Sequence, residues 1–100
     1  MTKEMILEDK DIKILTSWGH PKEDIPQIQR AIEVSTYTLY EIAPPYKEGK
    51  KLTAAEAHRK LGNKEFLSGI ARSAFHFSSA RNCLRGKKYG VLFDSSKLFK

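Results

Sequence analysis

The chain has 100 residues, and its 18 lysine and arginine side chains outnumber its 12 aspartate and glutamate side chains, for a formal net charge of +6. This length predicts one domain over residues 1–100 with a single modest core. A hydrophobic content of 40% with 30% charged residues excludes a disordered tail. No apolar run approaches the ~20 residues of a membrane-spanning helix. The early acidic residues do not fit a secretory signal and the lone Cys83 has no disulfide partner, so we expect a cytoplasmic protein without a membrane role.

The positive charge is concentrated in the second half of the chain. Residues 1–50 hold 7 basic and 9 acidic side chains, a net charge of −2, whereas residues 51–100 hold 11 basic and 3 acidic ones, a net charge of +8. A basic half of this kind favours an acidic partner, most often nucleic acid. The alternative is a lysine-rich surface that serves solubility alone.

The first elements along the chain are two predicted helices. Residues 8–18 carry acidic side chains in their first turn and place apolar side chains, Trp18 among them, near one helical face. Gly19 is expected to end this helix, since glycine readily adopts the backbone conformation of a C-cap. The second helix starts around Asp24.

Beyond the second helix, the apolar residues no longer follow the spacing that is typical of a helix. Residues 35–42 are rich in β-branched and aromatic side chains, which predicts a strand, and the alternative is a helix that continues to Tyr40. Residues 43–51 contain two successive prolines and Gly49. We expect an internal loop there, because proline lacks a hydrogen-bond donor for a sheet and glycine disfavours a helix.

The second half predicts two more helices and a final strand. Thr53 and Glu56 have the spacing of a capping box, which starts a short helix that Gly62 ends. A longer helix follows over 64–80, and residues 89–94 have the composition of a strand.

The order of these elements, α-α-β-α-α-β, defines the predicted fold class. We expect a single α+β domain whose helices pack on a small two-stranded sheet formed by residues 35–42 and 89–94. If the first of these segments were helical, the domain would instead be mostly α with a C-terminal strand or hairpin.

The long helix has an apolar face and a polar face. The polar face carries Ser68, Arg72 and His76 at intervals of four residues, and it is either an ordinary solvated surface or a site where the arginine and histidine approach phosphate or carboxylate. The apolar stripe consists of Phe66, Leu67, Ile70, Ala74 and Phe77.

Two further residues of this helix need an explanation. Glycine within a helix costs up to ~1 kcal/mol relative to alanine, so we expect another helix or a ligand to approach the backbone at Gly69. Phe75 lies on the flank of the polar face, so it is either part of a second core layer or an exposed ring available for stacking.

Basic residues continue beyond the long helix. If the helix stays regular, Arg81 lies roughly half a turn away from Arg72, so the two do not form one stripe, and the helix ends or bends near residues 79–82. Arg85, Lys87 and Lys88 then form a basic turn.

Residues 53–80 invite a helix-turn-helix interpretation, in which the second helix enters the major groove of DNA. The fit is partial, because Glu65 would be repelled by phosphate and Phe66 beside Leu67 makes the start of that helix apolar.

Nucleophile elbows, phosphate loops and dinucleotide-binding glycine patterns are absent from the sequence, and its histidines and Cys83 lack the spacing of a zinc site. We therefore expect no catalytic residues, cofactor or metal.

The stretch from Leu52 to Phe77 resembles segments of small uncharacterised proteins of Gram-positive bacteria, often linked to prophages or mobile elements. This resemblance covers about a quarter of the chain and brings no assigned activity. It implies a small accessory protein that binds nucleic acid or another protein.

The leading hypothesis is a small non-enzymatic module that binds nucleic acid through the phosphate backbone. The alternative is an adaptor or inhibitor that binds an acidic protein through Phe75, Arg72 and Tyr46. A third possibility is an enzyme or small-molecule binder around Arg72 and His76, and a homodimer formed through the N-terminal helices is compatible with any of these. The residues expected to contact the acidic partner are Ser68, Arg72, His76, Arg81, Arg85, Lys87 and Lys88.

Overall fold

The structure is a computed structural model that describes residues 7–42, 48–76, 79–83 and 88–99. In this part of the chain the helices are α1 (Asp9–Ser17), α2 (Ile25–Val34), α3 (Ala54–Leu61) and α4 (Asn63–His76), with short 3-10 turns η1 (Lys22–Asp24) and η2 (Ser96–Phe99). The strands are β1 (Thr36–Glu41), β2 (Glu48–Leu52), β3 (Ser79–Cys83) and β4 (Tyr89–Asp94). The predicted α+β class is confirmed, and the mostly α alternative is wrong.

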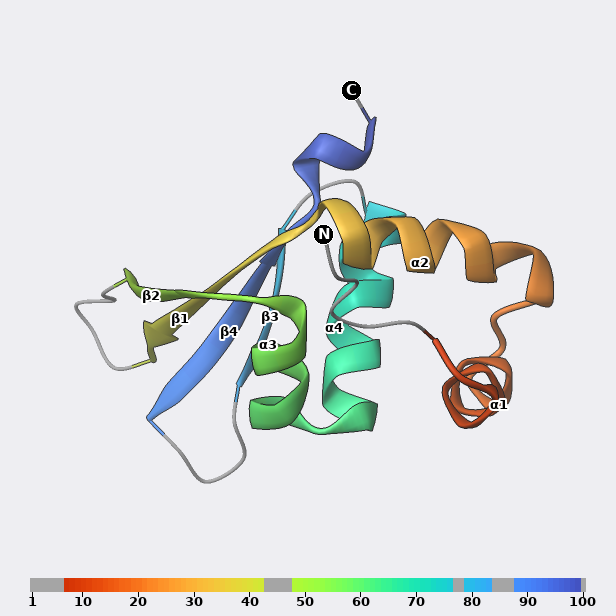
Figure 1. The fold of residues 1–100 in the computed structure, drawn as a ribbon, viewed down its shortest axis with the longest axis horizontal. Helices are drawn as coiled ribbons and strands as arrows, with labels where there is room; N and C mark the ends of the chain where they lie inside the picture. The colour runs from red at the N-terminus through yellow and green to blue at the C-terminus, as the bar shows by residue number, and fades with distance from the viewer. Residues whose placement is uncertain (1–6, 43–47, 77–78, 84–87, 100) are drawn as a thin grey trace.

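The strands form one antiparallel sheet in the order β2-β1-β4-β3 (Figure 1). The two predicted strands, β1 and β4, pair at its centre, with Tyr37 opposite Phe93 and Leu39 opposite Val91. The interpretation that the second helix continues to Tyr40 is therefore wrong. The expected two-stranded sheet is too small, because β2 and β3 add an edge strand on either side.

β2 begins inside the segment 43–51 that the sequence predicts as a loop, so that prediction is wrong for residues 48–51. It pairs with β1 through a register shift between Thr38 and Tyr40. A Cβ atom added at Gly49 would lie 3.2 Å from the carbonyl oxygen of Leu39, a closer approach than most side chains allow. Glycine is typical of such irregular points in a strand, so the residue expected to interrupt regular structure instead permits the pairing.

β3 begins inside the predicted long helix, whose last two residues, 79 and 80, it occupies. α4 ends at His76, and residues 79–83 pair with β4, with Ala80 opposite Phe93 and Asn82 opposite Val91. The prediction of a helix to residue 80 is therefore wrong. The segment is a strand because it forms backbone hydrogen bonds with β4, and the local sequence does not predict this long-range pairing.

The helices lie on one side of the sheet, with α4 next to it (Figure 1). α4 packs on β3 and β4, while α1, α2 and α3 pack on α4. The rings of Tyr37, Phe66 and Phe93 lie 5.5–5.8 Å apart between the sheet and α4. The largest fully buried apolar side chains are Phe66, Phe93, Leu15, Ile28, Leu67, Ile70 and Val91.

The packing of α4 against the sheet leaves no room for a side chain at Gly69. A Cβ atom added there would lie 2.4 Å from Cε1 of Phe93, whose side chain is fully buried. The group that approaches the helix backbone is thus a core side chain, and the expectation of a second helix or a ligand at this point is wrong.

The short helix α3 has the caps that its sequence predicts. The hydroxyl of Thr53 accepts a hydrogen bond from the backbone N–H of Glu56 at 3.1 Å, and the Glu56 carboxylate accepts one from the backbone N–H of Thr53 at 2.9 Å. Gly62 follows the helix with φ of 85°, a conformation that glycine adopts most easily. The predicted capping box and helix end are confirmed.

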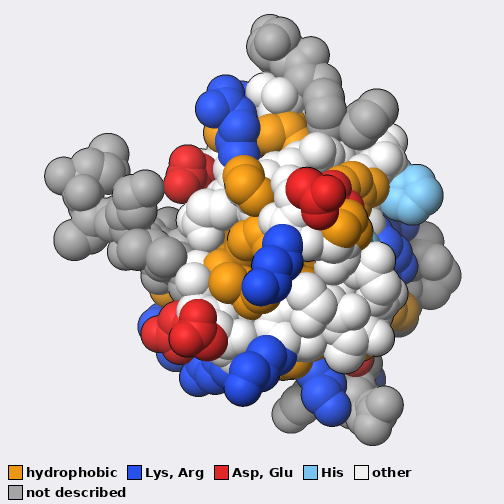
Figure 2. Space-filling view, turned by 90° about the vertical axis from the view of Figure 1, so that its right-hand side faces the viewer, with side chains coloured by type: hydrophobic (Ala, Val, Ile, Leu, Met, Phe, Trp, Pro, Cys, Tyr) orange, Lys and Arg blue, Asp and Glu red, His pale blue; other side chains and the backbone are white. Residues whose placement is uncertain are grey.

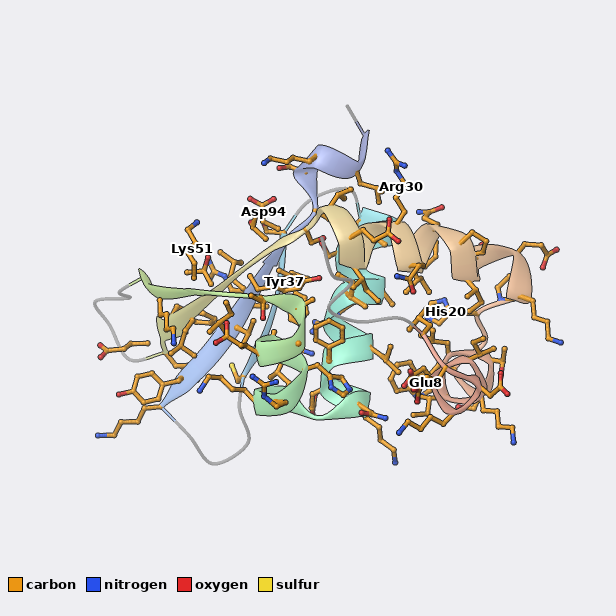
Figure 3. The ribbon with its side chains drawn as sticks, viewed as in Figure 1. Glu8, His20, Arg30, Tyr37, Lys51 and Asp94 are labelled. Carbon is orange, nitrogen blue, oxygen red and sulfur yellow. The ribbon has the colours of Figure 1, made fainter. Side chains whose placement is uncertain are left out.

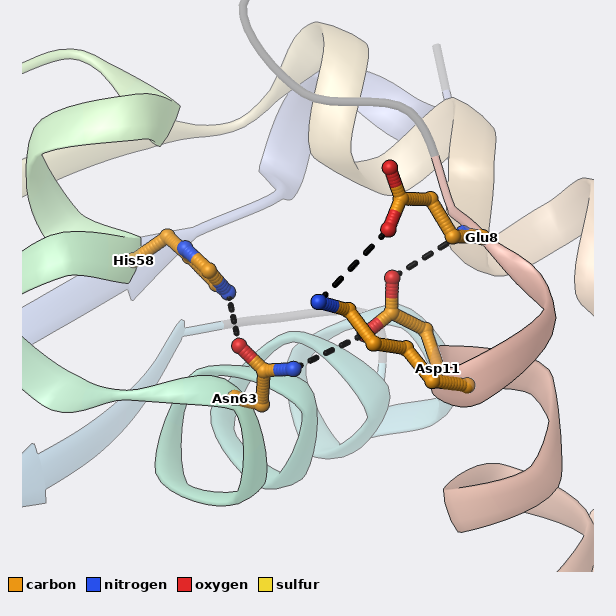
Figure 4. A network of polar contacts seen from close by, with 5 residues as sticks. Glu8, Asp11, His58 and Asn63 are labelled. Carbon is orange, nitrogen blue, oxygen red and sulfur yellow. Dashed lines mark hydrogen bonds and ion pairs between the residues drawn. The ribbon is translucent and has the colours of Figure 1, made fainter.

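A chain of polar contacts joins α1 to the α3–α4 junction (Figure 4). The carboxylate of Asp11, only 3% exposed, accepts hydrogen bonds from the backbone N–H of Glu8 at 3.0 Å and from Nδ2 of Asn63 at 3.4 Å. The other polar side-chain atom of Asn63, Oδ1, lies 2.5 Å from Nε2 of His58. At the exposed end of the network, Lys10 pairs with Glu8 at 3.7 Å.

Within the described ranges, none of the helices is of the length and apolar character that crossing a membrane requires.

Candidate nucleic-acid interface

The polar face predicted for the long helix is present on α4. Arg72 and His76 are exposed and Ser68 is half-buried, whereas Phe66, Leu67, Ile70 and Ala74 on the other side are fully buried. The remaining member of the predicted apolar stripe, Phe77, lies outside the described residues. Because the core holds the helix on one side, the polar side chains are presented on a rigid element.

The first hollow beside this face lies between the end of α1 and α4, and it has a volume of about 180 Å³. Its rim includes Trp18, whose side chain is 43% exposed. The sequence placed Trp18 on the buried face of the first helix. Its exposure follows from its position, since Trp18 is the C-cap of α1 and the chain turns away through Gly19 at φ of 97°. The hollow is lined by Trp18, His20, Ser68, Ala71, Arg72, Phe75 and His76.

Phe75 lies between the two alternatives weighed for it, because it is neither fully buried nor exposed. Its side chain is half-buried against the core, and its ring stacks on the imidazole of His20 with 5.5 Å between centroids and 13° between planes. His20 lies in the angle between α1, α2 and α4 (Figure 3). The stacked pair therefore forms part of the wall of the first hollow.

A second, wider hollow lies between α4 and the edge strand β3, and it has a volume of about 710 Å³. It is lined by Arg72, His76, Ser79, Ala80 and Arg81. Nη2 of Arg72 donates a hydrogen bond to the backbone carbonyl oxygen of Arg81 at 3.0 Å and another to Oδ1 of Asn82. The sequence predicts that Arg72 and Arg81 do not form one continuous stripe, and they lie on different elements. The backbone of Arg81 contacts Arg72 because the chain reverses after α4 and returns as β3.

Arg81 has a second contact, on the face of the sheet opposite to the helices. Its guanidinium carbon lies 5.7 Å from the centroid of the Tyr40 ring, within the range of a cation–π interaction. The Tyr40 ring in turn packs on Gly90, where an added Cβ atom would lie 2.7 Å from the phenol oxygen. These contacts hold Arg81 at the rim of the second hollow.

The charged side chains described around the two hollows are basic. They share Arg72 and His76, and among the described residues that line them there is no aspartate or glutamate. The surface seen on the α1–α2 side of the molecule has mixed charge. Figure 2 shows lysine, arginine, aspartate and glutamate side chains interspersed there around hydrophobic ones. Arg72 and the backbone of Arg81 therefore meet where α4 packs on β3.

The helix-turn-helix prediction is not supported by the position of α4. α3, Gly62 and α4 follow one another as predicted, and Phe66 of the apolar stripe is fully buried. However, α4 contacts α1, α2, α3, β3 and β4, so that its exposed face is a strip between neighbouring elements. A recognition helix needs a free face to enter the major groove.

Of the other predicted contact residues, Lys88 is described and is not among the residues that line the two hollows. Lys88 is exposed, and its backbone carbonyl oxygen accepts a hydrogen bond from the N–H of Ile42 at 2.8 Å. Arg85, Lys87 and Tyr46 lie outside the described residues, so their assignment stays a prediction.

The sequence interpretation missed Trp18, His20 and Asn82 as members of this region. The first two flank Gly19, and an aromatic residue directly before the glycine that ends a helix was the available signal. Asn82 had no signal, because its role depends on the distance between β3 and α4 in the folded chain: its Nδ2 donates to the backbone carbonyl oxygen of Glu65.

Comparisons of the chain with protein-family models, with curated proteins and with solved structures found no match. The resemblance of residues 52–77 to small prophage-linked proteins therefore stays a prediction. In the described ranges, His, Cys, Asp and Glu side chains do not gather in any group of three that could hold a metal ion. The function has to be argued from the two hollows.

Proposed function

We propose that this chain is a non-enzymatic, cytoplasmic nucleic-acid-binding module that contacts the phosphate backbone along the α4–β3 surface. The observation that carries the proposal is the shared border of the two hollows. Arg72 and His76 line both, Arg81 lines the wider one, and the lining residues that the structure describes include no carboxylate.

The arginines suit phosphate for a chemical reason. A guanidinium is planar and permanently charged, and its donors match two phosphate oxygens at once. The bonds from Nη2 of Arg72 to the backbone of Arg81 and to the side chain of Asn82 restrict the orientation of its plane before any ligand binds. A donor that is already oriented loses less conformational entropy on binding.

Salt dependence tests the proposal. Binding of labelled single-stranded and duplex oligonucleotides would be followed by fluorescence anisotropy over a series of salt concentrations. We expect log affinity to fall linearly with log salt, by about 0.7 per neutralised phosphate on a single strand and about 0.9 on duplex DNA. An absence of binding even at low salt would contradict the proposal.

A charge-matched pair of variants locates the contact. Arg81→Gln should reduce the salt slope by about 1, because one phosphate contact is lost. Arg59→Gln changes the net charge equally, but Arg59 is an exposed residue of α3 that lines neither hollow, so the slope should stay unchanged. Equal effects of the two substitutions, or displacement of nucleic acid by polyglutamate at equal charge, would favour the alternative of an acidic protein partner.

A further inference from the structure

We propose that the first hollow, at Trp18, holds an unpaired base, so that the ligand of this surface is a single strand. The inference rests on the proposed function and adds to it the form of nucleic acid that is bound. It is argued from the aromatic residues around the hollow, its size and its connection to the arginines.

Trp18 is an unusual residue to leave exposed. Among the described residues, Trp18 and Tyr89 are the large hydrophobic side chains that are exposed, each at 43%. Trp18 lies beside the stacked rings of His20 and Phe75, so one wall of the hollow is aromatic. Aromatic side chains bind the bases of single strands by stacking, without regard to sequence, because every base has a π-face.

The volume of the hollow fits one planar ring system. An apolar cavity of about 150 Å³ is sufficient to bind benzene, and this hollow measures about 180 Å³ and opens to solvent. Ser68 adds a hydroxyl that can donate to or accept from the edge of a base. The site thus combines an aromatic wall with a polar group at its side.

The hollow is continuous with the cationic surface. Because Arg72 and His76 line both hollows, a nucleotide whose base enters the first presents its phosphate to these two side chains. The strand can then follow the wider hollow towards Arg81. In a duplex the bases are stacked inside the helix and are unavailable to such a site unless they are unpaired at a cost in free energy.

Trp18 is also the probe for the experiment, since it is the only tryptophan of the chain. Its fluorescence would be titrated with a thymidine oligonucleotide, a uridine oligonucleotide, a duplex and an abasic oligomer with the same number of phosphates. We expect quenching by at least one of the single strands and none by the abasic oligomer, since only a stacked base lies against the indole. The thymidine and uridine arms distinguish DNA from RNA.

Variants separate stacking from charge. Trp18→Ala should weaken binding of the oligonucleotide by roughly 5- to 100-fold, whereas Trp18→Phe, which keeps a ring, should retain most of the affinity. Tyr89→Ala is the matched control, because Tyr89 is as exposed as Trp18 but lines neither hollow, and it should leave binding unchanged. Circular dichroism of each variant confirms that the fold persists.

The outcomes distinguish this inference from the proposed function. If the single strands and the abasic oligomer bind equally and Trp18→Ala has no effect, the base site is refuted while backbone binding stands. If no oligonucleotide binds at low salt, both proposals fail. Tighter binding of the duplex than of either single strand would also overturn the base site.

Discussion

The guanidinium of Arg72 in α4 donates a hydrogen bond to the backbone carbonyl oxygen of Arg81 in β3, with 3.0 Å between Nη2 and the oxygen. β3 is an edge strand of the sheet, and edge strands carry backbone groups that the sheet leaves unpaired. The bond therefore supplies a partner for this edge and joins α4 to the backbone of β3. Arg72 thus has a structural role at this edge in addition to the phosphate contact that we propose for it.

The substitution Arg72→Lys tests the structural part of this role. It keeps the charge but removes the planar fork that reaches the Arg81 carbonyl and Asn82 together. We expect a loss of about 1 kcal/mol of unfolding free energy and faster amide hydrogen exchange in β3. The control Arg59→Lys, on the exposed side of α3, should change neither quantity. If exchange in residues 79–83 is the same in both variants, the bond does not stabilise the edge.

Gly69→Ala should destabilise the protein although alanine favours helices. The added Cβ would overlap the buried ring of Phe93, and overpacking of a core typically costs about 1–3 kcal/mol, against a gain of up to ~1 kcal/mol in helix propensity. Denaturant unfolding measures the difference. Phe93→Leu puts a smaller side chain opposite the added Cβ. In the double variant Gly69→Ala with Phe93→Leu we therefore expect a loss of stability smaller than the sum of the two single losses, and strictly additive losses would contradict the close contact.

Asn63→Ala should loosen α1 from the α3–α4 junction. The substitution removes one of the hydrogen bonds to the buried carboxylate of Asp11 and the partner of His58, and an unsatisfied buried polar group costs about 1–3 kcal/mol. Thermal unfolding would show the loss. Lys10→Ala is the control, because the Lys10–Glu8 pair is exposed and such pairs contribute about 0–1 kcal/mol. Equal losses in both variants would contradict a specific role for the network.

The capping box of α3 predicts a pH dependence of stability. The hydrogen bond from the backbone N–H of Thr53 lowers the pKa of Glu56 below its ordinary value of 4.5, and Lys50 and Arg59 contribute in the same direction. A lowered pKa means that the ionised carboxylate is favoured in the folded state. Its contribution is therefore fully present above pH 4.5 and is lost as the pH falls through the lowered pKa.

Glu56→Gln isolates this effect, because glutamine can still accept the hydrogen bond from Thr53 but does not ionise. We expect the wild-type protein to be more stable than the variant above pH 4.5, and the difference to shrink as the pH falls further. Urea unfolding at a series of pH values measures it. A difference that stays constant with pH would show that the charge does not contribute.

The predictable parts of this fold are those whose cause lies within a few residues. Thr53 and Glu56 start α3, Gly62 ends it, and the β-branched and aromatic residues of β1 and β4 identify the two central strands. Central strands have neighbours on both sides, so their composition reflects that environment. The four-residue spacing of Ser68, Arg72 and His76 likewise places them on one helical face from the sequence alone.

The sequence by itself thus determined the fold class, the central strand pair and the polar face of α4. Only the tertiary structure decided the edge strands, because β2 and β3 are strands through pairing with β1 and β4 and carry few of the residues that favour strands. It also decided the candidate site. Trp18 lies far from Arg72 along the chain and meets its helix because α1 ends beside α4. Arg81 is close in sequence but returns to α4 only because the chain reverses after His76. Long-range packing creates that proximity, and no local pattern encodes it.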